Sequence, residues 1–282
     1  MDIVQIYILY PTDADCMRHL ESVRWNNEPV CPYCQSKNVT SYKAELRHHC
    51  NTCNTSFSVT VQTIFHNTKL DLQKWFLALT LVLNARKGIS ARQLSRDIEV
   101  NKDTAWRMLM QIRRAMLQDR ELLQGIVEID ETAICVKEKN KHSNKRTPGG
   151  GGKTNVIGTI ERGGKLKDSK ASNRKTRTLQ RIINSSISEG AVVMTDEWIG
   201  YHKLSQRFSH STVNHGSGNY VVGNVHTNTI EGFWSLFKRG IVGQYRQISD
   251  KHINKYLDEF CFRYNNRNSS EVFNDMIRKS VA

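Results

Sequence analysis

Four cysteines near the N-terminus constrain the fold of this chain more than any other feature. The segment 31-CPYCQSKNVTSYKAELRHHCNTC-53 has the pattern C-x2-C-x15-C-x2-C. Each C-x2-C turn directs two thiolates at one ion, and two such turns complete a tetrahedral shell with no open position. The pattern predicts one structural zinc ion in a ribbon domain over residues 1–66. Its ligands would be Cys31, Cys34, Cys50 and Cys53.

The sequence leaves two alternatives open at this metal site. Four thiolates also hold iron–sulfur clusters, and His48 or His49 could replace one cysteine. The other cysteines, Cys16, Cys135 and Cys261, have no partner at metal-binding spacing, and we expect them to be small buried hydrophobic residues. No export signal accompanies the seven cysteines, so reduced thiols are favoured over a disulfide scaffold.

The charge of the chain indicates its partner. Among 282 residues, 41 Lys and Arg oppose 27 Asp and Glu, a formal net charge of +14 that attracts polyanions. A basic membrane-surface protein would need an amphipathic basic helix or a polybasic tail, which neither terminus offers. The longest apolar run, 75-WFLALTLVL-83, is too short to span a bilayer. We expect nucleic acid as the partner, no membrane association, and two or three domains.

A helix-turn-helix is expected within a helical domain over residues 67–120. A buried helix should cover 70–88 and end at Gly88. A capping box of Ser90 and Gln93 then begins a second helix, and Asn101 caps a third after a short turn. A helical hairpin within a core is the alternative to a DNA-binding motif.

The last of these helices has an amphipathic pattern. Its residues expected to face inward at helical spacing are Ala105, Met108, Leu109 and Ile112. The residues left facing outward, where they would contact DNA, are Lys102, Asp103, Trp106 and Arg107.

Three acidic residues occur where surface chemistry explains them poorly. Asp130 lies inside the apolar strand 125–136, Asp196 ends a second strand, and Glu231 lies in a helix beside a buried apolar stripe. The structural alternatives are a strand-edge charge, a turn former, and a capping box of Asn228 with Glu231. Carboxylates brought together repel one another unless cations lie between them, and two magnesium ions are the cations that act on phosphodiesters.

Several sequence motifs of the chain resemble those of a known family. The motifs are 127-VEIDET-132, 194-MTDEWIGYHKL-204, 226-HTNTIEGFWSLFKRGI-241 and 256-YLDEFCFRYNNR-267, together with the cysteine ribbon. They resemble, over nearly the whole chain, DDE transposases of the zinc-ribbon insertion-sequence group related to Merlin elements, the ISXO2-like transposases. The resemblance implies an α/β fold: an RNase H-like catalytic domain over 121–282, a mixed sheet flanked by helices, preceded by the ribbon and the helix-turn-helix.

The resemblance also implies roles for individual residues. Asp130, Asp196 and Glu231 would be the catalytic acids that bind two Mg²⁺ ions, for which Mn²⁺ can substitute. Lys238 would hold a DNA phosphate. Glu128 lies two residues before Asp130 on the same strand face, so it is the alternative first ligand.

Two further residues match the family motif before the glutamate. His226 and Asn228 would orient water, metal or a DNA strand. The implied function is binding of transposon terminal inverted repeats, followed by Mg-dependent cleavage and strand transfer into target DNA. A homodimer or higher oligomer is implied because two ends must be joined. We expect the protein in the cytoplasm on the bacterial nucleoid, or in the nucleus of a eukaryotic host.

Other features leave alternatives. The Gly-rich basic stretches 137–154 and 162–177 are expected to be solvated hairpin loops rather than phosphate-binding loops, because 149-GGGGKT-154 lacks the spacing of a P-loop. An RNase H-like nuclease or resolvase would share the acids but make no strand-transfer product. A transposase-derived DNA-binding regulator would tolerate their loss, and the presence of all three acids argues against it.

Overall fold

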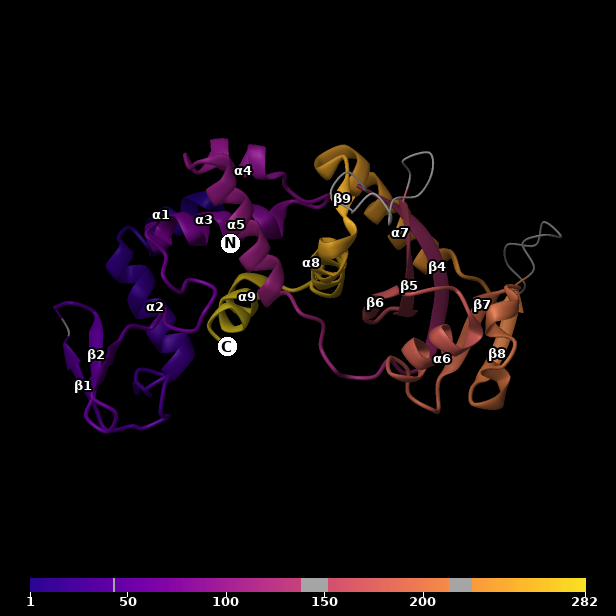
Figure 1. Ribbon diagram of the computed structural model, residues 1–282, viewed down its shortest axis with the longest axis horizontal. Coiled ribbons are helices and arrows are strands. Elements are labelled where there is room, and N and C mark those ends of the chain that lie inside the picture. The colour runs from indigo at the N-terminus through magenta and orange to yellow at the C-terminus, as the bar shows by residue number, and fades with distance from the viewer. Residues whose placement is uncertain (43, 138–151, 214–224) are drawn as a thin grey trace, which may run out of the picture. The chain divides into compact units, whose positions relative to one another are not determined.

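The computed structural model describes residues 1–42, 44–137, 152–213 and 225–282 (Figure 1). Contacts within the chain divide it into two compact units. The first unit comprises residues 1–116 and 269–282, and the second comprises residues 117–268. Within the described ranges, no helix is long and apolar enough to cross a membrane.

The first unit combines a small antiparallel sheet with helices. The sheet has the order β1 (Val39–Tyr42), β2 (Arg47–Cys50) and β3 (Thr55–Phe57). The helices are α1 (Ile3–Leu9), α2 (Asp13–Trp25), α3 (Leu72–Asn84), α4 (Ala91–Asp97), α5 (Lys102–Ala115) and α9 (Val272–Val281). Helix α3 ends before the expected position, and Gly88 instead adopts a left-handed conformation (φ +87°) in the following loop.

The C-terminal helix corrects the expected extent of the catalytic domain. Residues 269–282 were expected in the domain 121–282, yet they belong to the first unit. Helix α9 has an apolar face, and its Phe273 ring packs against the rings of Tyr10 and Phe76. In addition, the backbone N–H of Ile64 donates to the carbonyl of Ser280. Burial of this face decides where α9 packs. The boundary between residues 66 and 67 stays a prediction.

The second unit is built on a mixed sheet. Its main path has the order β6 (Leu166–Ala171), β5 (Gly152–Glu161), β4 (Ile126–Lys137), β7 (Val192–Asp196) and β8 (Ser209–Val213), and β9 (Ile248–Ser249) pairs with the end of β4. Strands β4, β5 and β6 are antiparallel neighbours, whereas β7 and β8 continue in parallel with β4. This is the RNase H-like arrangement, so the expected fold class is confirmed.

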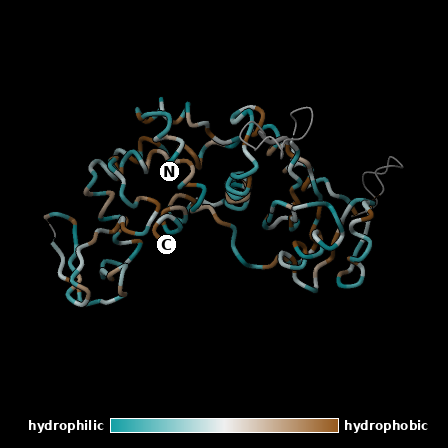
Figure 2. Tube along the Cα trace, in the orientation of Figure 1, coloured by the Kyte–Doolittle hydropathy of each residue, from teal (hydrophilic) through white to brown (hydrophobic). Residues whose placement is uncertain are grey.

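The two faces of the sheet carry different side chains. On one face Val127 and Ile129 join a buried cluster with Leu179 and Ile183 of α6 (Thr176–Asn184). Because side chains alternate along a strand, Glu128 and Asp130 point to the other face. Helix α7 (Asn228–Gly240) contacts β4 and β5, and helix α8 (Ile253–Asn265) contacts β6. Figure 2 shows hydrophobic and hydrophilic stretches alternating along the chain.

The second basic stretch is not a solvated loop. Residues 162–165 form a tight turn, and residues 166–171 form the regular edge strand β6, which pairs with β5. The expectation of a loop was wrong because backbone pairing with β5 and burial of Leu166 and Ala171 outweigh the polar composition. Most of the first stretch, 138–151, lies outside the described residues, while Gly152–Thr154 begin β5.

Candidate active site

The parallel pairing of β4 and β7 brings the first two acids together. Glu128 of β4 is level with Met194 of β7. Two residues further along each strand, on the same face, lie Asp130 and Asp196. The sheet therefore carries both carboxylates side by side at the end of β7. On its other side, Asp130 is paired with Gly158 of β5.

Gly158 allows α7 to approach the sheet beside Asp130. A Cβ atom at this position would lie 2.7 Å from Cζ2 of Trp234 and 2.8 Å from Cδ1 of Ile230. Both contacts are too close for a methyl group, so only glycine lets these two side chains reach the β5 backbone. Glu231 follows Ile230 directly in α7, which brings the third acid to the same region.

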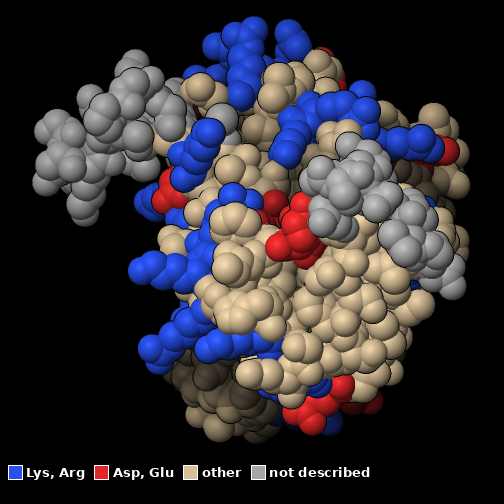
Figure 3. Space-filling model, turned by 90° about the vertical axis from the view of Figure 1, so that its right-hand side faces the viewer, with Lys and Arg blue, Asp and Glu red and all other residues tan. Residues whose placement is uncertain are grey.

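The electrostatics of Asp130 reflect this gathering of charge. Burial, and then the negative charges of Glu131, Asp196 and Glu231, together raise the pKa of Asp130 to about 7. On the face of the molecule drawn in Figure 3, a compact group of acidic side chains lies among many Lys and Arg side chains. The structure thus brings the three predicted acids within electrostatic range of one another. Glu231 itself is exposed at the start of α7.

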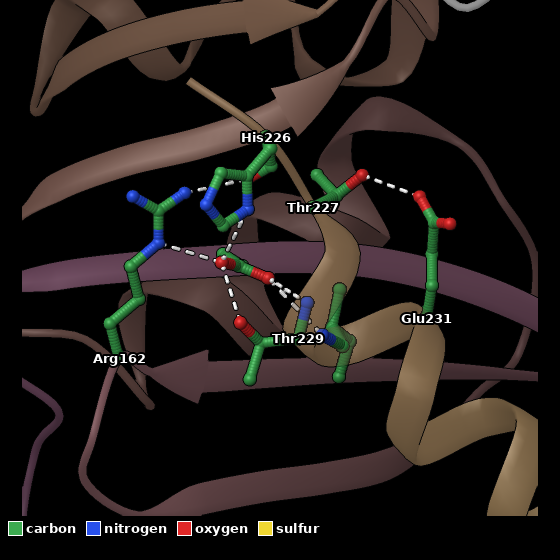
Figure 4. Close-up of polar contacts among 7 residues, drawn as sticks. Arg162, His226, Thr227, Thr229 and Glu231 are labelled. Carbon is green, nitrogen blue, oxygen red and sulfur yellow. Dashed lines mark hydrogen bonds and ion pairs between the residues drawn. The ribbon is translucent and has the colours of Figure 1, made fainter. Parts of the chain in front are cut away.

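Glu128, the alternative first ligand, has a different environment (Figure 4). Its side chain is completely buried, and Oε1 accepts hydrogen bonds from Nε of Arg162 at 2.7 Å and from the hydroxyl of Thr229 at 2.9 Å. Its Oε2 accepts from the backbone N–H groups of Thr229 at 2.8 Å and Ile230 at 3.1 Å. A strand carboxylate therefore caps the first turn of α7.

This cap replaces the capping box considered for Glu231. Thr227, not Asn228, precedes the helix as its N-cap, and it makes no side-chain bond to the helix backbone. Instead its hydroxyl donates to Oε1 of Glu231 at 2.7 Å (Figure 4). Because Glu128 already satisfies the first N–H groups, Glu231 does not act as the partner of an Asn228 cap.

The residues expected to support the three acids lie in α7 or just before it. Nδ1 of His226 lies 3.2 Å from Oε1 of Glu128 but outside hydrogen-bonding geometry, and the His226 carbonyl accepts from Arg162 at 2.9 Å. His226 is thus part of the Glu128 network. Asn228 and Lys238 are exposed on α7. Sequence reasoning missed Arg162 and Thr229, because no local pattern links them to Glu128, which lies 34 and 101 residues earlier.

The cysteines of the zinc site lie in the first sheet or close to it in the sequence: Cys50 ends β2, Cys31 and Cys34 precede β1, and Cys53 lies in the turn between β2 and β3. The four cysteine sulfurs lie within 4.8 Å of one another, with Sγ of Cys31 3.6 Å from that of Cys53 and Sγ of Cys34 3.5 Å from that of Cys50. A tetrahedral Zn–S₄ site with bonds of about 2.3 Å needs sulfur separations near 4 Å. The donor set and its spacing therefore fit one zinc ion.

Neither histidine is a ligand. The ring nitrogens of His48 lie 2.9 Å from the hydroxyl of Ser41 and 2.8 Å from Glu21, and Nδ1 of His49 lies 3.1 Å from the hydroxyl of Ser56. Cys16 and Cys261 are buried, as expected. The side chain of Cys135 lies outside the described residues.

Helices α4 and α5 follow one another across a short turn and pack together, and their assignment as a DNA-binding helix-turn-helix stays a prediction. The side chain of Asn101 caps α5 by accepting from the backbone of Asp103 at 2.8 Å. The residues predicted to face inward, Ala105, Met108, Leu109 and Ile112, are all buried. The residues predicted to contact DNA, Lys102, Asp103, Trp106 and Arg107, are all exposed.

The cap of α4 differs from the expected box. Ser90 accepts from the backbone of Gln93 at 3.2 Å. The Gln93 side chain, however, donates to Asp97 and accepts from Arg96 instead of turning back to Ser90. The capping box is therefore one-sided.

Two known protein domains match separate parts of the chain. Residues 122–265 match the ISXO2-like transposase domain, and residues 11–56 match the transposase zinc-ribbon domain. An uncharacterized protein in transposable element ISH50 of Halobacterium salinarum is 30% identical over 261 residues, which cover 86% of this chain and 88% of that protein.

Solved structures show a more distant likeness. The Mos1 transposase paired-end complex with left transposon end is 12% identical at a TM-score of 0.29, covering 73% of this chain and 78% of that one. The Mos1 strand transfer complex is 14% identical at a TM-score of 0.30, covering 73% and 74%. The domain matches cover the four cysteines and the mixed sheet, the ISH50 relative covers 86% of the chain, and the chain belongs to the ISXO2-like transposase family.

Proposed function

We propose that this transposase binds the terminal inverted repeats of its element and catalyses Mg-dependent DNA cleavage and strand transfer. Asp130, Asp196 and Glu231 are the catalytic acids of this proposal. Water would cleave the phosphodiester at the transposon end and release a 3′-hydroxyl. That hydroxyl would then attack a phosphodiester of target DNA at the same site, so no covalent bond to the protein is needed.

One observation carries the proposal: Asp130, Asp196 and Glu231 come from three separate elements and lie within electrostatic range of one another. Burial, and then the charges of Glu131, Asp196 and Glu231, raise the pKa of Asp130 to about 7. A fold gains nothing in stability from such repulsion, whereas a site for divalent cations requires it. Oxygen ligands of this kind suit Mg²⁺, and Mn²⁺ can substitute. When bound, the cations would activate water and stabilise the leaving oxygen.

Residues of this chain would do the remaining work. Lys238, exposed on the same helix as Glu231, would hold a DNA phosphate. The Glu128 network, which includes His226, would keep the start of α7 in place so that Glu231 faces the strand acids. Asn228, exposed beside Thr227, would contact water or DNA.

Recognition of the DNA ends is assigned to the first unit. Lys102, Trp106 and Arg107 lie exposed on α5, the second helix of the helix-turn-helix, and Asp103 lies beside them. The net charge of +14 supplies the attraction to phosphate that such binding needs. Because the reaction joins two ends, we propose that the protein acts as a dimer or higher oligomer on DNA, in the compartment that holds the chromosome.

The test separates charge from shape at the third acid. In Glu231→Gln the amide oxygen can still accept the hydrogen bond from Thr227, but the negative charge is lost. We expect an unchanged melting temperature, unchanged binding of terminal-repeat DNA, and cleavage reduced by orders of magnitude. Asp130→Asn and Asp196→Asn should likewise bind terminal-repeat DNA normally and lose cleavage by orders of magnitude. Glu189→Gln, at an exposed acid of the same unit, is the matched control and should cleave normally.

The product distinguishes the remaining functions. Strand-transfer joints between end DNA and a plasmid target would support transposition. Cleavage without joints would indicate a nuclease or resolvase. Full strand transfer by Glu231→Gln would defeat the catalytic assignment of this residue.

A further inference from the structure

An aromatic residue with no role in the chemistry above closely follows one of the proposed catalytic acids in the chain. Trp198 follows Asp196 by two residues, and its backbone N–H donates to Oδ1 of that aspartate at 3.1 Å. Its side chain is 40% exposed, although large aromatic rings usually lie buried. A surface indole tied to a catalytic carboxylate requires an explanation.

Two contacts hold the indole in place. The guanidinium of Arg174 lies over the ring, 5.3 Å from its centroid, and Arg174 is itself anchored by an ion pair of 2.6 Å to Glu131. A Cβ at Gly200 would lie 2.6 Å from Nε1 and 2.7 Å from Cδ1 of Trp198, so this part of the indole packs directly on the Gly200 backbone. The anchor is firm because Glu131 is buried and also accepts from the hydroxyl of Tyr201.

With these contacts made, 40% of Trp198 is still exposed, two residues after Asp196. An exposed part of an indole can stack with a flat partner. Nucleobases stack on such aromatic platforms regardless of their sequence, and Arg174 adds positive charge for the neighbouring phosphate. A ring that is already fixed loses little side-chain entropy when a base binds.

We propose that Trp198 is the stacking platform for one nucleobase of the transposon end, next to the phosphodiester that is cut. The proposal rests on the function proposed above and identifies the part of the substrate that this surface binds. Stacking would hold a base that has left the duplex at the cut, and would thereby keep the scissile phosphate over the three acids. Trp198 is a substrate-binding residue in this proposal, not an acid or base.

A double-mutant cycle, in which the protein and the DNA are changed singly and together, tests this proposal. Duplexes carrying the element's terminal repeat are prepared intact and with a single abasic site at each nucleotide flanking the cut. Cleavage with Mg²⁺ is measured for wild type and Trp198→Ala. We expect Trp198→Ala to cleave the intact duplex roughly 10-fold to 100-fold more slowly, the loss of one base–aromatic stack. At one flanking position, removal of the base should slow wild type similarly but slow Trp198→Ala no further.

Two variants control for folding and for the neighbourhood. Trp198→Phe keeps an aromatic face and should recover most of the cleavage rate. Ile199→Ala, at a neighbour that is 74% exposed and not aromatic, should cleave like wild type. Melting temperatures of all variants should match that of wild type, because the exposed ring contributes little to the core.

The outcomes separate this proposal from the proposed function. If wild type cleaves and joins DNA, but the effects of Trp198→Ala and base removal are additive at every position, the stacking platform is refuted while transposition stands. A Trp198→Ala protein that cleaves at the wild-type rate has the same meaning. If wild type itself neither cleaves nor joins end DNA, the proposed function fails and the platform falls with it.

Discussion

Removing the charge of Asp130 should make the metal-free protein more stable, even though it abolishes the proposed activity. The pKa of this carboxyl is raised from 3.8 to about 7 in the folded state. A carboxyl whose pKa rises on folding destabilises the native state once it is ionised there. The penalty is absent below pH 4, grows between pH 4 and 7, and is complete above pH 7. Asp130→Asn, which resembles the neutral acid, should remove it.

The size of the effect follows from the shift. A difference of about 3 pKa units corresponds to a destabilisation of about 4 kcal/mol. Because Asp130 is partly exposed, screening by water lowers this value, and we take about 2 kcal/mol as its lower bound. We therefore expect the free energy of unfolding of Asp130→Asn to exceed that of wild type by about 2–4 kcal/mol at pH 8. At pH 5 the difference should be much smaller. Added Mg²⁺ should reverse the order, because it would stabilise wild type and not the variant.

Hydrogen exchange measured by mass spectrometry suits this test, because it reports on peptides of β4 and β7 separately from the first unit. Divalent metals are removed from the buffers with a resin rather than with a chelator in the sample, so that the ribbon keeps its zinc. Glu189→Gln should show no pH-dependent difference from wild type. Equal or faster exchange in Asp130→Asn at pH 8 would refute the electrostatic argument, and with it the reading of these acids as a cation site.

Three other predictions concern the supports of the site. Glu128→Gln should lower the free energy of unfolding by roughly 3 kcal/mol, because the amide NH₂ group would face N–H donors that now bond to the carboxylate. Hydrogen exchange of the first residues of α7 should become faster, and unchanged exchange there would exclude the cap. Gly158→Ala should cost roughly 1–3 kcal/mol in a denaturant titration and impair cleavage, whereas Gly190→Ala, where nothing lies within 4 Å, should do neither. Cys50→Ser should release about one zinc per chain by atomic spectroscopy and weaken end binding, while Cys16→Ser should retain its zinc.

Local patterns were sufficient to predict much of the fold. The spacing of the cysteines predicted the ribbon, and the helical periodicity around Leu109 predicted which side chains of α5 are buried. Asp130 and Asp196 could be identified because they interrupt or end apolar strands. Each of these signals depends on residues within about 20 positions of one another, which is the range over which periodicity and turn chemistry act.

Contacts between distant residues left no such signal. The loop expected over 162–177 is an edge strand because β5 offers it a pairing partner, which its own composition does not reveal. Helix α9 joins the first unit because its apolar face matches Tyr10 and Phe76, more than 190 residues earlier. Gly158 is the clearest case, since its importance comes from two α7 side chains that occupy the space a Cβ would need.

Glu128 and Asp130 show why residue type and strand position could not decide between two candidate ligands. They lie two residues apart on the same face of β4, and the sequence favours neither on physical grounds. Glu128 meets the start of α7, where two backbone N–H groups and Arg162 supply the positive charge that a buried carboxylate needs. Asp130 meets Glu131, Asp196 and Glu231, which supply more negative charge. The first carboxylate is neutralised by the protein itself, whereas the second is not, and the proposed function assigns a cation to it.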